Sequence, residues 1–317
     1  MTGATIADPP AAGFQHWAHF YRDDREFLAG VVGFVREGLA ADEAVVVVEP
    51  ANRLELLREA LADDAAAVQF HDMAQVGANP ARILAVWQDV VAQHVAAGRA
   101  LRGVGEPAFV GRREAELLEC HLHELLLNHA FDGGAAWRLL CPYDERELPS
   151  AVCDGARTTH PAWSGPTGQV RGPAVLGAAV AAAFSAPLPA GSGTPRRMRS
   201  YRSGDLPGVR GLVTETARSW GLSGERIEAL VLAASELATN SVRHGGGEGA
   251  LSAWRDFGSG VLEFTDSGHL TDPLAGRRPP GTGVDGGRGL YLVNELCDLV
   301  QLRSSAAGTT VRLTTWL

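Results

Sequence analysis

A glutamate and an asparagine, Glu236 and Asn240, stand four residues apart in a segment with helical periodicity. Apolar residues recur at helical spacing across 226–242, and the segment runs into the glycines at 245–247, so we expect an amphipathic helix that ends there. Residues four apart lie one turn apart on the same helix face. A carboxylate above a carboxamide can accept a proton while the amide oxygen binds a hydrated Mg²⁺. A solvated helix face is the alternative interpretation.

Three later stretches place further chemistry-bearing residues in a fixed order. A strand pattern runs into Asp266-Ser267-Gly268, the run Gly286-Gly287-Arg288-Gly289-Leu290 opens a second apolar-periodic helix, and Gly308-Thr309-Thr310 begins a final alternating strand. Together with the Glu236 and Asn240 segment, this order resembles that of the Bergerat-fold ATPases, which include gyrases, heat-shock chaperones, mismatch-repair ATPases and histidine kinases. The resemblance covers about residues 197–317. We expect a mostly antiparallel two-layer α/β sandwich there, with the helices on one face.

The resemblance implies a site for ATP and Mg²⁺. Asp266 would accept a hydrogen bond from the adenine amino group, Gly268 would let the purine approach the backbone, and Thr309 matches the family threonine that binds adenine. The glycines at 287 and 289 would keep side chains off the phosphates, and the helix starting at 288 would offer them free N–H groups. The expected nucleotide-binding residues are Asn240, Asp266, Gly268, Gly287, Arg288, Gly289, Leu290 and Thr309, with Asn240 also binding the metal and Glu236 acting as catalytic base.

The chain contains no lysine, because all 28 of its basic residues are arginine. This excludes a Walker A loop and a Schiff-base enzyme, both of which require a lysine amine. Arg288, with Arg277 or Arg278 in the long loop 267–287, could neutralise γ-phosphate charge instead. For the pair at 277 and 278, a solvated lid is the alternative.

Longer sequence motifs narrow the resemblance to one group within these ATPases. Three motifs are similar to those of the compact anti-sigma-factor serine kinases. They are Ser235-Glu-Leu-Ala-Thr-Asn-Ser-Val-Arg-His-Gly245, Thr271-Asp-Pro-Leu-Ala275 and Gly287-Arg-Gly-Leu-Tyr-Leu-Val-Asn-Glu-Leu-Cys297. This implies ATP-dependent phosphorylation of a serine on a small anti-anti-sigma (STAS) protein, and partner switching that decides whether a sigma factor is held. It also implies a homodimer, whose contact we expect the apolar stripe Val209–Ala217 to extend.

The first half of the chain alternates strand and helix patterns. Strand-like runs at 44–48, 68–70, 101–104 and 137–141 are separated by helical patterns at 54–61, 83–97 and 114–130, which predicts a parallel sheet covered on both faces. Residues 14–185 resemble the MEDS sensory domain, which implies a RecA-like sheet used for sensing. The words that carry this resemblance are Gly103-Val-Gly-Glu-Pro107, Cys141-Pro-Tyr-Asp144 and Thr159-His160-Pro161, together with His19, Tyr21 and Gly38-Leu39.

Glu106 and Asp144 follow two of these predicted strands. Ligands of open α/β sheets bind at the carboxyl ends of the strands. We therefore expect the first domain to regulate the second rather than to catalyse; a simple docking platform is the alternative.

Two constellations in the first half suggest other chemistry. The segment His123-Glu124-Leu125-Leu126 looks like the phospho-acceptor box of a histidine kinase, but it lacks the proline expected a turn later. A zinc site formed by histidines and neighbouring residues is a second possibility. Residues 121 and 123, however, would point to different faces of a helix. The alternative is that these are ordinary, partly buried histidines. The candidate zinc ligands are His16, His19, Cys120, His121, His123, Glu124 and His129.

Composition favours a two-domain cytoplasmic protein. We expect a sensory domain at 14–185, a Pro/Gly linker at 186–196 and an ATPase domain at 197–317. A net charge of −9 without a basic run argues against direct binding of nucleic acid. Four scattered cysteines favour reduced thiols, and we expect neither a signal peptide nor a membrane span.

The sequence thus predicts an ATP-dependent protein serine/threonine kinase that acts as an anti-sigma factor in signal transduction and transcription regulation. A sensor histidine kinase-like protein is one alternative. A catalytically silent, nucleotide-dependent binding module is another. Phosphoserine survives acid and phosphohistidine does not, so the product would separate the two kinases.

Overall fold

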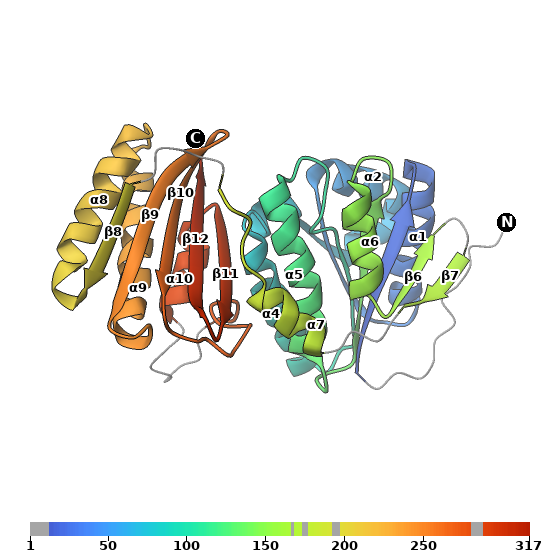
Figure 1. Ribbon diagram of the computed structural model, residues 1–317. Coiled ribbons are helices and arrows are strands. Elements are labelled where there is room, and N and C mark those ends of the chain that lie inside the picture. Colours follow the sequence, from blue (N-terminus) through green and yellow to red (C-terminus); the bar gives the residue numbers. More distant parts are fainter. Residues whose placement is uncertain (1–12, 166–167, 173–176, 192–196, 280–287) are drawn as a thin grey trace. The chain divides into compact units, whose positions relative to one another are not determined.

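A computed structural model describes residues 13–165, 168–172, 177–191, 197–279 and 288–317 (Figure 1). The chain divides into two compact units, Met1–Ala179 and Val180–Leu317. Each unit has its own sheet and its own hydrophobic core.

The first unit contains a seven-stranded, mostly parallel sheet in the order β3-β2-β4-β5-β1-β6-β7, of which only β7 runs antiparallel to its neighbour. Its strands are β1 (Phe14–Tyr21), β2 (Ala44–Glu49), β3 (Val68–Asp72), β4 (Leu101–Gly105), β5 (Trp137–Asp144), β6 (Ala162–Gly165) and β7 (Gly168–Arg171). Its helices are α1 (Asp24–Ala40), α2 (Ala51–Leu61), α3 (Met73–Val76), α4 (Ile83–Ala96), α5 (Glu114–Phe131) and α6 (Ser150–Thr159), with short 3-10 helices at Ala62–Ala67 and Pro80–Arg82.

Helices cover this sheet on both faces, as the sequence predicts (Figure 1). All six residues of β2 are buried, because α1 and α2 pack on one side of the strand and the sheet's other face is covered as well. A strand that is buried on both faces has a continuous run of apolar residues, whereas a strand with one solvent-exposed face alternates apolar and polar residues. The helix α1 starts where Asp23 accepts a hydrogen bond from the Glu26 amide at 2.7 Å, which satisfies one free N–H group of its first turn.

The position of β1 is a feature that the sequence pattern does not reveal. This strand lies inside the sheet, paired with β5 on one side and β6 on the other. Two buried histidines interrupt its apolar pattern, and their ring nitrogens are satisfied by residues far along the chain, such as Asn128 and Ser164.

The second unit contains a five-stranded antiparallel sheet in the order β11-β12-β10-β9-β8. Its strands are β8 (Arg197–Arg202), β9 (Glu248–Asp256), β10 (Ser259–Asp266), β11 (Leu299–Ser305) and β12 (Gly308–Trp316). Its helices are α8 (Leu206–Ser219), α9 (Gly224–His244) and α10 (Arg288–Leu296), with a 3-10 helix at Ser203–Asp205; α7 (Gly177–Ser185) precedes them.

The helices α8, α9 and α10 cover one face of this sheet (Figure 1), which confirms the expected two-layer α/β sandwich. The apolar stripe of α8 is part of this core: Val209, Val213 and Ala217 are at most 1% exposed. The expectation that this stripe extends a dimer contact is therefore wrong, because α9 and the sheet already cover it.

Within the described residues, no helix is long and apolar enough to cross a membrane. The four cysteines are free thiols, and all are buried.

Candidate functional site

Glu236 and Asn240 lie on the partly buried face of α9, beside the first turn of α10. The Ser223 side chain caps the start of α9, and Arg243 and His244 stand in its last turn, where cations suit the helix dipole. Gly289 of α10 approaches the pair so closely that a Cβ at this position would lie 2.7 Å from Glu236 Oε2 and 3.6 Å from Asn240 Nδ2. A side chain at this position would displace the Glu236 carboxylate from its place. The fold thus brings together three residues that the sequence places in two separate motifs.

Asp266 ends β10 directly beside the end of α9. Its carboxylate accepts hydrogen bonds from Ser241 Oγ at 2.7 Å and from the Gly268 amide at 2.9 Å. Ser241 is in turn held by the hydroxyl of buried Tyr201 at 3.0 Å. At Gly245, a Cβ would lie 2.3 Å from Asp266 Cγ, so a glycine is required where the helix end meets the strand end. Both carboxylate oxygens are fixed in orientation and keep capacity to accept a further hydrogen bond.

Thr309 lies opposite Asp266 in the β10–β12 register. Its hydroxyl donates to the Gly268 carbonyl at 2.8 Å and lies 2.7 Å from Ser304 Oγ, which accepts from the Leu270 amide. Asp266, Gly268 and Thr309 therefore form one hydrogen-bonded group at the end of the sheet.

In the described part of the loop after Asp266, 267–279, the alternative of a solvated lid does not hold for Arg277. Arg277 is buried at 3% exposed, and Leu274 at 1%. The Asn294 side chain donates to the Gly276 carbonyl at 2.8 Å, which fastens this part of the loop to α10. Arg277 therefore belongs to the packed base of the loop, whereas Arg278 and Arg288 are exposed. The expected phosphate contact at Gly287 lies outside the described residues.

Two family models match the chain. The model of the MEDS domain (MEthanogen/methylotroph, DcmR Sensory domain) matches residues 15–161, and that of the histidine kinase-like ATPase domain matches residues 200–315. The chain joins a MEDS domain to a histidine kinase-like ATPase domain. No curated protein matches it. A solved structure with some likeness contains the RsbU and RsbW domains of a Mycobacterium tuberculosis protein; it is 22% identical, and the match covers 39% of this chain and 33% of that one with a TM-score of 0.30.

A cavity of about 460 Å³ lies in the same unit as the ATPase domain, between the segment 185–191 and the sheet. Residues 263, 265, 303 and 312 line it, together with Asp266 and Thr309 at its end. Glu236, Asn240 and Gly289 do not line it. The contact between α9 and α10 is therefore separate from this cavity.

The MEDS domain gathers buried acids at the carboxyl ends of its parallel strands. Glu49 ends β2 and is fully buried, Glu106 follows β4 at 2% exposed, and Asp144 ends β5 at 1%. Tyr21, at the end of β1, donates to Glu106 at 2.9 Å, and Arg53 donates to Asp144 at 3.3 Å. The two acids named from the sequence, Glu106 and Asp144, thus stand at the same edge of the sheet, where open α/β sheets bind ligands.

This acidic group makes the stability of the MEDS domain depend on pH. Burial raises the pKa of Glu106 from 4.5 to about 7, and burial beside Glu106 raises the pKa of Glu49 well above its ordinary value. Between about pH 4.5 and 7 the folded state therefore holds more protons than the unfolded state, so this group's contribution to stability falls as the pH rises. Tyr21, Arg53 and Asp144 also face Glu106.

We expect Glu106→Gln to stabilise the chain relative to wild type at pH 8, by up to about 3 kcal/mol, and much less at pH 5. The glutamine oxygen still accepts from Tyr21, but it has no charge to bury. Thermal melts of both proteins at the two pH values measure the difference, with Glu55→Gln on the exposed face of α2 as control. An equal difference at both pH values would show that Glu106 is not the group that titrates.

The structure does not support the two other constellations seen in the sequence. His123 is 1% exposed, so the segment 123–126 does not present an acceptor histidine. The candidate zinc ligands do not converge as a set: Cys120 donates to the Pro107 carbonyl, His19 contacts Ser164 and the Glu26 carbonyl, and His129 is exposed. Of that set, only His16 and Glu124 lie in a cluster of potential metal ligands among the described residues.

Proposed function

We propose that this chain is an ATP-dependent protein serine kinase and anti-sigma factor, whose substrate is a STAS anti-anti-sigma protein. The observation that carries the proposal is the approach of Gly289 to Glu236 and Asn240, with the Asp266 group at the end of the neighbouring strand. A base, an oxygen donor for a metal, a side-chain-free helix start and an adenine acceptor are the parts that phosphoryl transfer from ATP needs.

In this arrangement Asp266 fixes the adenine, and the first turn of α10 holds the phosphates. Glu236 takes the proton of the substrate serine, whose oxygen attacks the γ-phosphorus; the bond to the bridging oxygen breaks and ADP leaves. The carboxamide of Asn240 provides the kind of oxygen donor that Mg²⁺ takes, and bound Mg²⁺ would neutralise charge on the phosphates. Arg288 is exposed at the start of α10 and supplies the positive charge that a lysine gives in other ATPases.

The MEDS domain is the regulatory part of this proposal. Its buried acids at the carboxyl edge of the sheet mark where a signal would act, through a ligand or a protein surface that favours one state of the chain over another. We also propose a homodimer in the cytoplasm, in which sigma factor and STAS protein compete for the ATPase domain.

The test is transfer of labelled phosphate. The full chain is incubated with Mg·ATP labelled at the γ-position and with purified STAS proteins from the same organism. We expect label on one STAS protein that survives acid treatment and maps to a serine. Acid-labile label on the chain itself would instead favour a histidine kinase. Nucleotide binding without any transfer would favour a silent binding module.

A further inference from the structure

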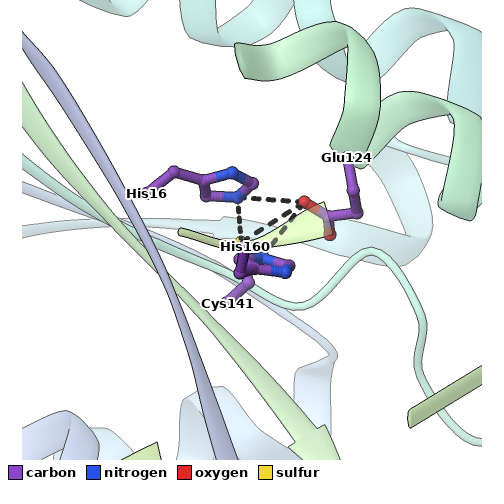
Figure 2. Close-up of side chains that lie close together, drawn as sticks. All are labelled: His16, Glu124, Cys141 and His160. Atoms are coloured by element: carbon purple, nitrogen blue, oxygen red, sulfur yellow. Dashed lines mark hydrogen bonds and ion pairs between the residues drawn. The ribbon is translucent and has the colours of Figure 1, made fainter. Parts of the chain in front are cut away.

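Four side chains from separate parts of the first unit converge in its interior (Figure 2). His16 comes from β1, Glu124 from α5, Cys141 from β5, and His160 directly follows α6. Each offers one ligand atom, and the four atoms lie within 4.8 Å of one another. All four residues are at most 2% exposed. The sequence words around Cys141 and His160 point to the MEDS family, but nothing in their spacing shows that they meet.

The distances between these atoms are those of ligands around one small ion. His16 Nε2 lies 3.0 Å from Glu124 Oε2 and 3.3 Å from Cys141 Sγ. Glu124 Oε2 lies 3.5 Å from His160 Nε2 and 3.8 Å from Cys141 Sγ. Ligand atoms about 2.0–2.3 Å from a tetrahedral zinc ion are about 3.3–3.7 Å apart. The His16–Glu124 pair would have to open slightly and the wider pairs, at up to 4.8 Å, would have to close for the four atoms to surround one ion.

Hydrogen bonds outside the cluster aim both imidazoles into it. His160 Nδ1 lies 2.8 Å from the Ala156 carbonyl, which can only accept, so this nitrogen carries the proton. His16 Nδ1 lies 3.2 Å from Asn128 Oδ1, and Asn128 is held in this orientation because its Nδ2 donates to the carbonyls of residues 124 and 159. In the neutral rings, both Nε2 atoms then present lone pairs to the cluster. Metal-binding histidines are oriented in this way.

These lone pairs face other acceptors. His160 Nε2 is fully buried with no hydrogen-bond partner among the described residues, and the atom in front of it is a carboxylate oxygen. The other oxygen of Glu124 accepts from Tyr143 at 2.8 Å, which fixes the carboxylate. The two Nε2 atoms and the Glu124 oxygen are all acceptors, and the Cys141 thiol is the one group among the four that carries a proton into the cluster. The centre of the cluster therefore lacks positive charge. A divalent cation supplies it, since 2+ is balanced by one thiolate and one carboxylate.

We propose that His16, Glu124, Cys141 and His160 bind one Zn²⁺. The set of two nitrogens, one sulfur and one oxygen suits zinc, whereas Mg²⁺ and Ca²⁺ take oxygen ligands. On binding, the Cys141 S–H bond breaks, a sulfur–zinc bond forms and one proton leaves to solvent. With all four positions filled by protein, the ion fastens β1 and β5 to α5 and to the end of α6 as a structural centre.

The first test is the metal content of the full chain, purified without chelator and measured by inductively coupled plasma mass spectrometry. We expect about one zinc per chain in wild type and almost none in Cys141→Ser or His160→Ala. Cys153→Ser, which changes another buried cysteine of the same unit, is the matched control and keeps its zinc.

Because a ligand variant can fail to fold, wild type is also refolded from denaturant with Co²⁺ replacing zinc. We expect the intense absorption of a cobalt–thiolate bond together with the visible bands of tetrahedral cobalt. A folded wild-type chain that holds neither zinc nor cobalt overturns the proposal, and the cluster is then a hydrogen-bonded network held by protons. A different metal lost in Cys141→Ser overturns the choice of zinc but keeps the site. Zinc retained equally in every variant is adventitious and overturns both.

Discussion

Replacing Glu236 with glutamine is expected to slow phosphoryl transfer to the STAS protein by about 10²–10⁴-fold while ATP still binds. Glutamine keeps the shape of the side chain beside Gly289, so the packing of α9 against α10 is preserved. It cannot take the serine proton, and that is the step assigned to Glu236. Single-turnover transfer measures the rate, and calorimetry measures the affinity for Mg·ATP.

The matched control is Glu228→Gln, the same change on the exposed face of the same helix. It should transfer phosphate at the wild-type rate. If Glu236→Gln transferred as fast as its control, the base would be another group. If it lost ATP binding as well, Glu236 would act in holding the nucleotide rather than in the chemical step.

Asp266→Asn is expected to weaken ATP binding by about 10- to 150-fold, because it replaces a charged acceptor of the adenine amino group, worth about 1.5–3 kcal/mol. Asparagine keeps an oxygen for the Gly268 amide, and its nitrogen can donate to Ser241 Oγ, which is able to accept. The fold should therefore survive, so that the loss is one of affinity. Calorimetry gives the dissociation constant, and a thermal melt without nucleotide checks the fold.

Asp256→Asn serves as the control for this change. Asp256 ends β9, at the opposite end of the β9–β10 pair, and is remote from the proposed adenine site. A comparison of ATP with GTP sharpens the experiment, since only adenine carries the amino group that Asp266 would bind. Unchanged ATP affinity in Asp266→Asn would mean that the adenine lies elsewhere.

The sequence predicts well the features that depend on neighbouring residues. The buried strand 44–48 is recognisable because a strand covered on both faces must be apolar throughout, and the structure confirms it as part of β2. The helix carrying Glu236 and Asn240 is recognisable from its period and its glycine stop, and α9 confirms it.

Features that depend on contacts between residues far apart in the chain cannot be predicted from the sequence pattern. His16 lies in β1, a strand that the sequence pattern does not reveal, and only the fold shows its contacts with Asn128 and Glu124. Likewise, Arg277 looks like a solvated loop residue until the loop is seen to fold back onto α10. Proximity of Gly289 to Glu236 could be inferred only through family resemblance, because no local pattern links two helices that are far apart in the chain.

Strand order also bears on how this polypeptide is made. In the second sheet β12 lies between β10 and β11, so the sheet cannot close until residues 308–316 leave the ribosome. In the first sheet β1 is made first, yet it must wait for β5 and β6, more than a hundred residues later. During synthesis both sheets therefore expose unpaired strand edges, which readily pair with the wrong chain. A nascent chain that stalls before β12 should depend on chaperones to avoid aggregation, whereas a chain that has completed β12 should not.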